Sequence, residues 1–270
     1  MANPKTATTT RAGQRYYDWR GERFYSVTTM INGGMPKPAL INWAKKFTAE
    51  YAYDHQDVLA AMVADGDRDG AIDWLKNAAY RDRDKKADLG TYLHEAIEAY
   101  ALGKPFPKIR DEASARMTNF HGFLEEYRPV FEMTEASVFN RTHRYAGTLD
   151  AIIRLGDPGN GEGARLLLDM KSGKAVYPEV ALQLAAYTHA EFVAMPDGSE
   201  KPMPPVDGAC ALHLSDDGFE LVDVQADEEV FRFFLHVREV YRWKTDVENH
   251  VLRGPLRLDG PVQQMSLEAS

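Results

Sequence analysis

The sequence predicts an α/β protein in which a mixed β-sheet core is flanked by helices and preceded by an N-terminal helical layer. Apolar residues recur at helical spacing from residue 38 to about residue 103. From residue 134 the apolar residues follow patterns typical of β-strands. One further helical stretch separates the third of these runs from the fourth. The expected order is helices, three strands, helix, two strands and helix. This order is typical of a sheet covered by helices.

The N-terminal half is expected to contain a flexible tail at residues 1–14 and then a strand and helical layer at residues 15–88. Residues 15–27 alternate aromatic and polar side chains, which predicts a short strand or hairpin. Pro38 suits the first position of a helix, and Gly103-Lys104-Pro105 is a helix stop signal. The helices expected from apolar spacing cover residues 38–51, 56–64, 72–80, 89–103 and 111–132.

The remaining residues are expected to form the core domain over residues 89–252, followed by an irregular C-terminal tail at residues 253–270. A loop with four glycines, residues 156–163, predicts a hairpin between two of the strands. The expected strands cover residues 137–140, 145–155, 164–170, 208–215 and 219–225, and the expected helices residues 178–194 and 227–249.

Composition narrows the class of protein. The chain has 270 residues, a formal net charge of −9 and 44% hydrophobic residues, which is normal for a globular protein. Its single cysteine, Cys210, excludes a disulfide framework and a cysteine-ligated iron–sulfur cluster. It has neither the roughly 18 apolar residues of a membrane span nor a secretory signal, so we expect a cytoplasmic protein without a membrane partner. The negative net charge does not favour binding to nucleic acid, although bound metal ions can make the local electrostatic potential positive.

A strand end with charged residues is the most informative segment. Asp169 and Lys171 follow three leucines and project from the same face of the strand. Asp150 lies on the neighbouring strand of the predicted hairpin. Two adjacent carboxylates raise each other's pKa unless a cation lies between them, and Mg²⁺ prefers such oxygen ligands. Taken alone, the Asp169–Lys171 pair also fits an ordinary ion pair at a strand end.

Two helices add polar side chains. His94 lies at the edge of an apolar helix stripe, with Glu98 one turn later on the same side. Gln183 and Tyr187 are neighbours at positions i and i+4 of the helix that follows the Asp169 strand. Each also fits an ordinary boundary position. Together with two strand carboxylates, His94 becomes a candidate metal ligand.

Four motifs in order, Gly90-x-x-x-His94, Gly147-x-x-Asp150, Asp169-x-Lys171 and Gln183-x-x-x-Tyr187, give the chain a family resemblance. The series resembles RecB-like nucleases of the PD-(D/E)XK superfamily, including phage recombination exonucleases and CRISPR-associated adaptation nucleases. The resemblance covers roughly residues 85–190 and implies a restriction-endonuclease-like core. Two departures stand out. No proline precedes Asp150, and the four-cysteine cluster of many such nucleases is absent, so no iron–sulfur cluster is expected.

The resemblance also implies roles for individual residues. Lys171, Asp150 and Asp169 would be catalytic, with Lys171 touching the attacking water and the scissile phosphate. A separate hypothesis is that Glu135 or Glu98 holds a second ion, and Glu135 is preferred because it precedes a β-run beside the site. Both residues also fit ordinary surface carboxylates. The implied metal ligands are His94, Asp150, Asp169 and the backbone carbonyl of Met170, and the implied supporting or DNA-contacting residues are Gln183, Tyr187, Ser172 and Lys174.

Basic residues are clustered despite the acidic net charge. Arg141 and Arg144 precede the Asp150 motif by a few residues and are the preferred pair for contacting DNA phosphates. Another group, Arg238, Arg242 and Lys244, lies late in the last helix. Each cluster equally fits a solvated face.

The function expected from these residues is a Mg²⁺- or Mn²⁺-dependent DNA exonuclease of phage or bacterial recombination or repair. It would act in the cytoplasm of a bacterium or phage-infected host, with a single-strand annealing protein or helicase as partner. Three alternatives stay open: a structure-specific or nicking endonuclease, a non-catalytic DNA-binding module that retains the fold, and a small-molecule metallohydrolase. The last is weaker because the chain lacks an H-E-x-x-H signature.

Overall fold

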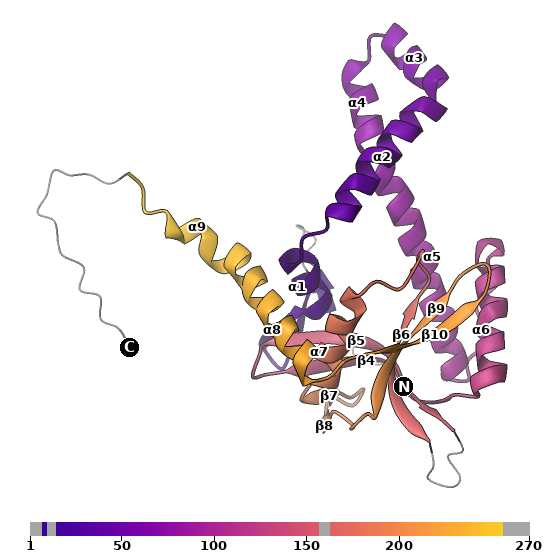
Figure 1. Ribbon diagram of the computed structural model, residues 1–270, viewed down its shortest axis with the longest axis vertical. Helices are drawn as coiled ribbons and strands as arrows, with labels where there is room; N and C mark the ends of the chain where they lie inside the picture. The colour runs from indigo at the N-terminus through magenta and orange to yellow at the C-terminus, as the bar shows by residue number, and fades with distance from the viewer. Residues whose placement is uncertain (1–6, 10–14, 157–162, 256–270) are drawn as a thin grey trace, which may run out of the picture.

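The computed structural model describes residues 7–9, 15–156 and 163–255, and it has a mixed α/β architecture (Figure 1). A mostly antiparallel, open sheet is flanked by helices. The strands are β1 (Ala7–Thr9), β2 (Arg15–Trp19), β3 (Glu22–Ser26), β4 (Val130–Asn140), β5 (Tyr145–Leu155), β6 (Ala164–Lys171), β7 (Phe192–Ala194), β8 (Glu200–Pro202), β9 (Gly208–Leu214) and β10 (Phe219–Val224). The helices are α1 (Val27–Gly34), α2 (Pro38–Asp54), α3 (Gln56–Ala64), α4 (Arg68–Lys76), α5 (Ala78–Ala101), α6 (Ser114–Tyr127), α7 (Glu179–Thr188), α8 (Glu228–Arg242) and α9 (Glu248–Val251).

Strand β5 is the centre of the sheet. One of its edges pairs with β4 over nearly the whole length. The other edge pairs first with β3, at Tyr145 and Ala146, and then with β6 from Ala151 onward. Residues 147–150 lie between these two partners. Strand β6 then pairs in parallel with β9, and α7 lies in the connection between them. The segment of β5 that carries Gly147 and Asp150 therefore lies where the sheet changes partners.

Helices cover both faces of the sheet. The larger core contains buried residues of α1, α7 and α8 together with inward residues of β4, β5 and β9. The second core packs α5 and α6 against β6, β9 and the far half of β5. Helix α5 contributes Leu93 and Ile97, each 2% exposed, and this burial fixes its orientation on the sheet. Its neighbouring residue His94 is thereby held at the sheet surface.

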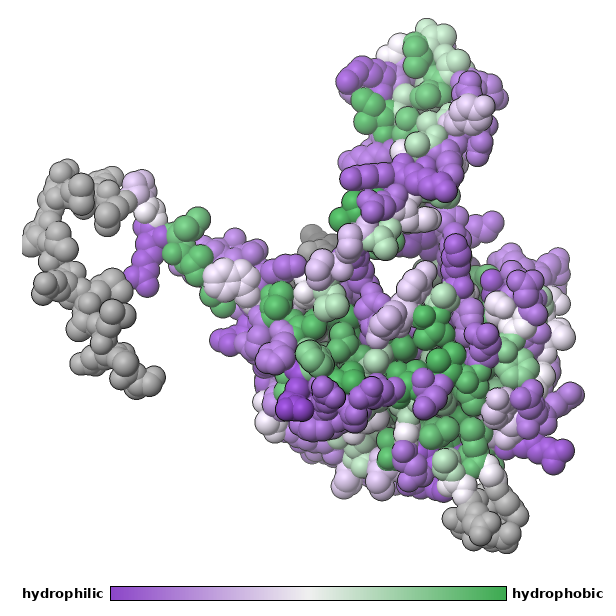
Figure 2. Space-filling view, viewed as in Figure 1, coloured by the Kyte–Doolittle hydropathy of each residue, from purple (hydrophilic) through white to green (hydrophobic). Residues whose placement is uncertain are grey.

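Helices α2, α3 and α4 form an arm with the first turns of α5, and this arm projects away from the sheet (Figure 1). Neither α2 nor α3 contains a buried residue. Hydrophobic side chains are visible at the tip of the arm (Figure 2). The exposed hydrophobic residues of the arm include Val58 and Val63 of α3 and Ile72 of α4. The helices of the arm are held together by packed aromatic rings, among them Tyr51 of α2 and Trp74 of α4, whose ring centroids are 4.9 Å apart.

Several predicted elements have the expected bounds. The sequence placed a helix at 56–64 and a strand at 145–155, and α3 and β5 have these bounds. The hairpin expected within 15–27 is β2–β3. Gly103 takes a positive φ of 63° after α5, as its predicted role as a helix stop requires. No helix in the described part of the chain is long and apolar enough to cross a membrane.

Other predictions differ from the structure. The helix expected to reach residue 132 ends at Tyr127, because Arg128 takes a left-handed conformation and β4 begins at Val130. The helix expected over 178–194 ends at Thr188, and the last three residues of that range form β7 against β4. Their pairing partner lies about 50 residues earlier, so helical spacing alone does not reveal it.

The predicted domain boundaries also differ. Helix α5 is continuous across the boundary expected at residue 88, so the arm and core share one helix. Within the predicted N-terminal tail, Ala7–Thr9 pairs with β2 as strand β1, because β2 offers an open sheet edge. Residues 1–6 and 10–14, and all but the first three residues of the expected C-terminal tail, lie outside the described residues.

Candidate metal centre

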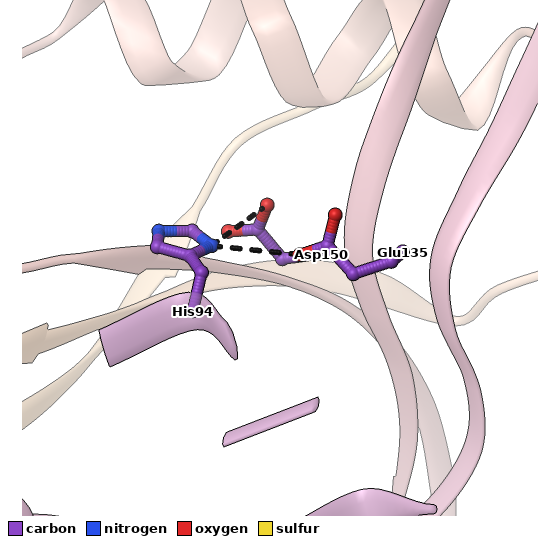
Figure 3. A group of neighbouring side chains, drawn as sticks. All are labelled: His94, Glu135 and Asp150. Carbon is purple, nitrogen blue, oxygen red and sulfur yellow. Dashed lines mark ion pairs between the residues drawn. The ribbon is translucent and has the colours of Figure 1, made fainter. Parts of the chain in front are cut away.

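Three side chains from three elements point toward one another at the surface of the sheet (Figure 3). They are His94 of α5, Glu135 of β4 and Asp150 of β5. The Nδ1 atom of His94 lies 3.6 Å from Glu135 Oε1 and 3.6 Å from Asp150 Oδ1. The ligand atoms of the three residues all lie within 4.8 Å of one another. Ligands on one Mg²⁺ lie up to roughly 4.2 Å apart, so small side-chain adjustments would let one ion contact all three.

Glu135 is positioned by an unusual backbone conformation. Its φ is +45° in the middle of β4, in the left-handed region that residues other than glycine seldom occupy. The residues on either side of it pair with Ala151 and Leu149, so Glu135 lies opposite Asp150. Such a conformation costs on the order of 1–3 kcal/mol and is found mainly at functional sites. The local distortion of β4 therefore coincides with the carboxylate that completes the group.

A second group of polar side chains adjoins the first. Asp169 is 2% exposed, and its two oxygens contact different partners. Oδ2 lies 2.6 Å from Lys171 Nζ, and Oδ1 accepts a hydrogen bond from Gln183 Nε2 at 2.7 Å. The two groups are linked through the backbone, because the Met170 N–H donates to Asp150 Oδ2 at 2.6 Å.

The predicted ligand set therefore differs from the group in the structure. His94 and Asp150 belong to the group in the structure, but its third member is Glu135. Asp169 instead contacts Lys171 and Gln183. Glu98 is not a member of the group found among the described residues. Met170 reaches the site through its N–H, and its carbonyl as a ligand stays a prediction.

Burial and the charges of neighbouring groups shift the pKa values of His94 and Asp150. Desolvation and the charge of Asp169 raise the pKa of Asp150 to about 7, although His94, the Met170 N–H and Lys171 act in the opposite direction. Burial lowers the pKa of His94, but the hydrogen bond to Glu135 and the charges of Asp150, Glu135 and Asp169 outweigh this and raise it to about 8. The cluster therefore holds protons at neutral pH and favours a cation.

Metal affinity should consequently rise with pH. A bound ion requires neutral His94 and ionised Asp150, so it displaces the protons that these groups hold below their pKa values of about 8 and about 7. We expect the Mn²⁺ association constant to rise about tenfold per pH unit for each displaced proton between pH 6 and 8. Isothermal titration in buffers of different ionisation enthalpy measures both the affinity and the protons released. A pH-independent affinity without proton release would contradict the assignment.

Tyr187 closes the site from α7. It is 3% exposed, and its ring packs directly on the backbone of Gly147. A Cβ atom at residue 147 would lie 2.2 Å from Tyr187 Cε1. Burial raises the pKa of Tyr187 well above its usual value, so its hydroxyl stays protonated. The glycine of the Gly147-x-x-Asp150 motif thus has a packing role.

Replacing Gly147 by Ala should therefore destabilise the protein by about 1–3 kcal/mol, because the new methyl group overpacks a buried ring. Urea unfolding followed by circular dichroism measures this loss. Gly173→Ala is a matched control, because nothing lies within 4 Å of a Cβ at that position. Equal free energies of unfolding for the two variants would show that the packing of the Tyr187 ring does not require glycine at residue 147.

Other predicted residues lie outside the group. Ser172 lies beside α5, since its Oγ is 3.4 Å from the position of a Cβ on Gly90. Lys174 is exposed and lines a separate cleft that also contains His213, Glu220 and Asp223. Their contact with DNA stays a prediction.

Arg141 and Arg144 are not brought to the site. They lie at the hairpin before β5, roughly 17 Å along the strand from Asp150. Arg141 donates to Glu200 at 2.7 and 2.9 Å and to Glu22 at 3.1 Å, and Arg144 donates to Glu22 at 2.6 Å. The hydrogen bond from Arg141 lowers the pKa of Glu200 to about 2. These contacts join β3, β8 and the hairpin, so the two arginines contribute to an ion-pair network within the sheet.

The sequence analysis missed contributions from the N-terminal strands and α1. The Tyr17 hydroxyl lies 3.1 Å from Thr148 Oγ1, next to the metal group on β5. A cleft of about 230 Å³ beside Lys171 and Gln183 is also lined by Thr28, Asn32 and Lys37. These residues precede Lys171 by more than 130 positions, and no spacing signal connects them to it.

Comparisons with known proteins add little. No family model matches the chain, and no curated protein matches it. A solved structure described as the crystal structure of SSO0001 aligns with 62% of this chain and 70% of its own, at 14% identity and a TM-score of 0.28.

Proposed function

We propose that the protein is a divalent-metal-dependent deoxyribonuclease, an exonuclease of phage or bacterial recombination or repair, with a restriction-endonuclease-like core. The observation that carries the proposal is the convergence of His94, Glu135 and Asp150 beside the Asp169–Lys171 pair. These side chains come from a helix and three strands, and they provide a cation site next to an ammonium group. Phosphodiester hydrolysis requires both features.

The order of elements around the site supports the proposed core. After α5 and α6 come the antiparallel strands β4, β5 and β6, then α7, the short strands β7 and β8, and β9, which pairs in parallel with β6. This arrangement agrees with the mixed sheet flanked by helices that the resemblance implies. Each of the four motifs lies on one of these elements.

A bound ion and the side chains of the protein would contribute different parts of the reaction chemistry. A bound divalent ion lowers the pKa of its water and offsets charge on phosphate oxygens. His94, Glu135 and Asp150 fit such an ion through one nitrogen and two carboxylates, a mixture that suits Mn²⁺ at least as well as Mg²⁺. Asp169 and Gln183 orient Lys171, whose ammonium group would lie against the scissile phosphate. The neighbouring cleft with Lys37 has room and positive charge for the strand on one side of that phosphate.

Digestion of end-labelled DNA tests the proposal. Single-stranded and double-stranded linear oligonucleotides and a covalently closed circle are incubated with Mn²⁺, Mg²⁺ or EDTA. We expect nucleotides to be released from linear DNA in the presence of metal and the closed circle to stay intact. Cleavage of the circle would identify an endonuclease. Metal-independent binding without hydrolysis would support a non-catalytic DNA-binding module and contradict the proposal.

A further inference from the structure

A second candidate site lies at the other end of β5, between the β-hairpins and the end of α8. It is a cleft of about 340 Å³, and four arginines line it: Arg23, Arg144, Arg238 and Arg242. Asp246 is the carboxylate among its lining residues. The cleft shares no lining residue with the metal centre, which lies roughly 17 Å further along β5.

Each of these arginines also meets a carboxylate, and these carboxylates are shared or loosely held. Arg238 and Arg242 both contact the same residue, Glu239. Arg23 lies 3.6 Å from Asp18, which is a loose ion pair, and the Arg23 side chain is 62% exposed. Arg242 is 59% exposed. Arg144 donates to Glu22 at 2.6 Å, but Glu22 also accepts from Arg141. Because two of the carboxylates are each shared by two arginines and Arg23 is loosely held, a phosphate dianion can compete with these carboxylates for the guanidinium groups.

Tyr241 provides an independent sign of a ligand. The residue is 6% exposed, and its hydroxyl has no hydrogen-bond partner among the described residues. Its ring is held in place, because a Cβ on Gly33 would lie 2.6 Å from Tyr241 Cδ2 and because Tyr25 packs edge-on at 5.9 Å. A buried hydroxyl without a partner costs about 1–3 kcal/mol. Tyr241 lines the cleft, and its hydroxyl is the one buried side-chain donor without a partner among the residues that line it.

The backbone beside the cleft is also unusual. Trp243–Val247 forms a π-helical turn after α8, and Thr245 and Asp246 of this turn line the cleft. Turns of this kind are rare and occur frequently at functional sites. The turn follows Tyr241 directly, and Thr245 donates back to the Tyr241 carbonyl at 3.2 Å.

We propose that this cleft binds a phosphate group, held by its arginines and by the hydroxyl of Tyr241. Guanidinium groups bind phosphate oxygens with paired hydrogen bonds, and several of them together suit a group of charge −1 to −2. The phosphate belongs either to a nucleic-acid strand or to a free nucleotide or pyrophosphate. The proposal does not depend on the proposed nuclease activity, because the cleft is separate from the metal centre.

Binding in EDTA tests the cleft without any contribution from metal. Inorganic pyrophosphate is titrated by calorimetry, and a fluorescent 12-nucleotide DNA strand is titrated by anisotropy at several salt concentrations. Tyr241→Phe removes the hydroxyl and keeps the ring, and Arg242→Gln removes an exposed charge. Arg68→Gln is the matched control, because this arginine is 81% exposed and lies on the arm. We expect each cleft variant to weaken pyrophosphate binding about fivefold to tenfold and the control to leave it unchanged.

The two probes distinguish the sources of the phosphate. A parallel loss of DNA affinity, with a smaller salt dependence for Arg242→Gln, identifies a nucleic-acid strand as the ligand. A loss confined to pyrophosphate identifies a free phosphate compound. The proposal is overturned if wild-type protein does not bind pyrophosphate and Tyr241→Phe and Arg242→Gln bind DNA like Arg68→Gln. It is also overturned if Tyr241→Phe only raises the melting temperature and leaves both affinities unchanged. Failure of DNA digestion with intact pyrophosphate binding would contradict the nuclease proposal alone.

Discussion

Replacing Lys171 by Ala should reduce metal-dependent DNA hydrolysis by about 10²–10⁴-fold, if the protein acts as proposed. The ammonium group of Lys171 lies 2.6 Å from Asp169 Oδ2 and is the positive charge nearest to this carboxylate in the described site. Its loss would remove charge stabilisation at the scissile phosphate without removing a metal ligand. Single-turnover digestion of a labelled oligonucleotide in excess Mn²⁺ measures the effect.

Lys201→Ala is the matched control for this variant. Lys201 is exposed on β8, the strand at the far edge of the sheet. The Lys171 variant leaves the buried Asp169 with Gln183 as its partner, so its folding must be checked by circular dichroism. Lys171→Met is a second variant that keeps most of the side-chain packing. A folded Lys171 variant that digests DNA at the wild-type rate would reject the assigned role.

Replacing Asp150 by Asn should abolish stabilisation by metal and at the same time stabilise the metal-free protein. Wild-type protein should melt at a higher temperature in millimolar Mn²⁺ than in EDTA, because an ion that binds the folded state stabilises it. The variant lacks one of the two carboxylates of the metal group, so its melting temperature should not respond to Mn²⁺. Differential scanning fluorimetry with and without metal measures both effects.

The pH dependence gives the second half of this prediction. The folded-state pKa of Asp150 is raised to about 7 from an ordinary value near 4, so ionisation destabilises the metal-free fold as pH rises between these values. The amide of Asp150→Asn does not ionise, and we expect this variant to be more stable than wild type by on the order of 2 kcal/mol at pH 7 and above and equal to wild type below pH 4. The raised pKa of His94 changes stability in the same direction, because its stabilising contribution is present below pH 6.5 and is lost as pH rises through about pH 8.

Glu135→Gln separates ligand loss from backbone strain. This variant keeps the left-handed conformation of residue 135, whereas Glu135→Gly accepts that conformation without strain. Equal Mn²⁺ responses of wild type, Asp150→Asn and Glu135→Gln would contradict the assigned metal group.

Local sequence patterns predicted much of the core. The bounds of β5 follow from a run of β-formers between two turn sequences, and the end of α5 follows from Gly103. His94, Asp150, Lys171 and Gln183 were identified because each lies at a fixed place on one element, and the structure brings these four side chains to one region of the sheet.

The tertiary structure decided the composition of the site. Glu135 joins His94 and Asp150 because of a left-handed residue within β4, a conformation that no hydrophobic period encodes. Arg141 pairs with Glu22 and Glu200, at separations of 119 and 59 residues, so its proximity to Asp150 in the sequence did not place it at the site. The end of α7 depended on the edge that β4 offers to β7.

The sequence by itself therefore determined the main helices and strands, apart from the short elements β1, α1, β7 and β8, and the chemistry carried by each, since both depend on neighbouring residues and their periodicity. Which carboxylates share a space, and which arginines are neutralised by distant partners, was decided only in three dimensions. The physical reason is that burial, charge pairing and backbone strain depend on contacts between residues far apart in the chain.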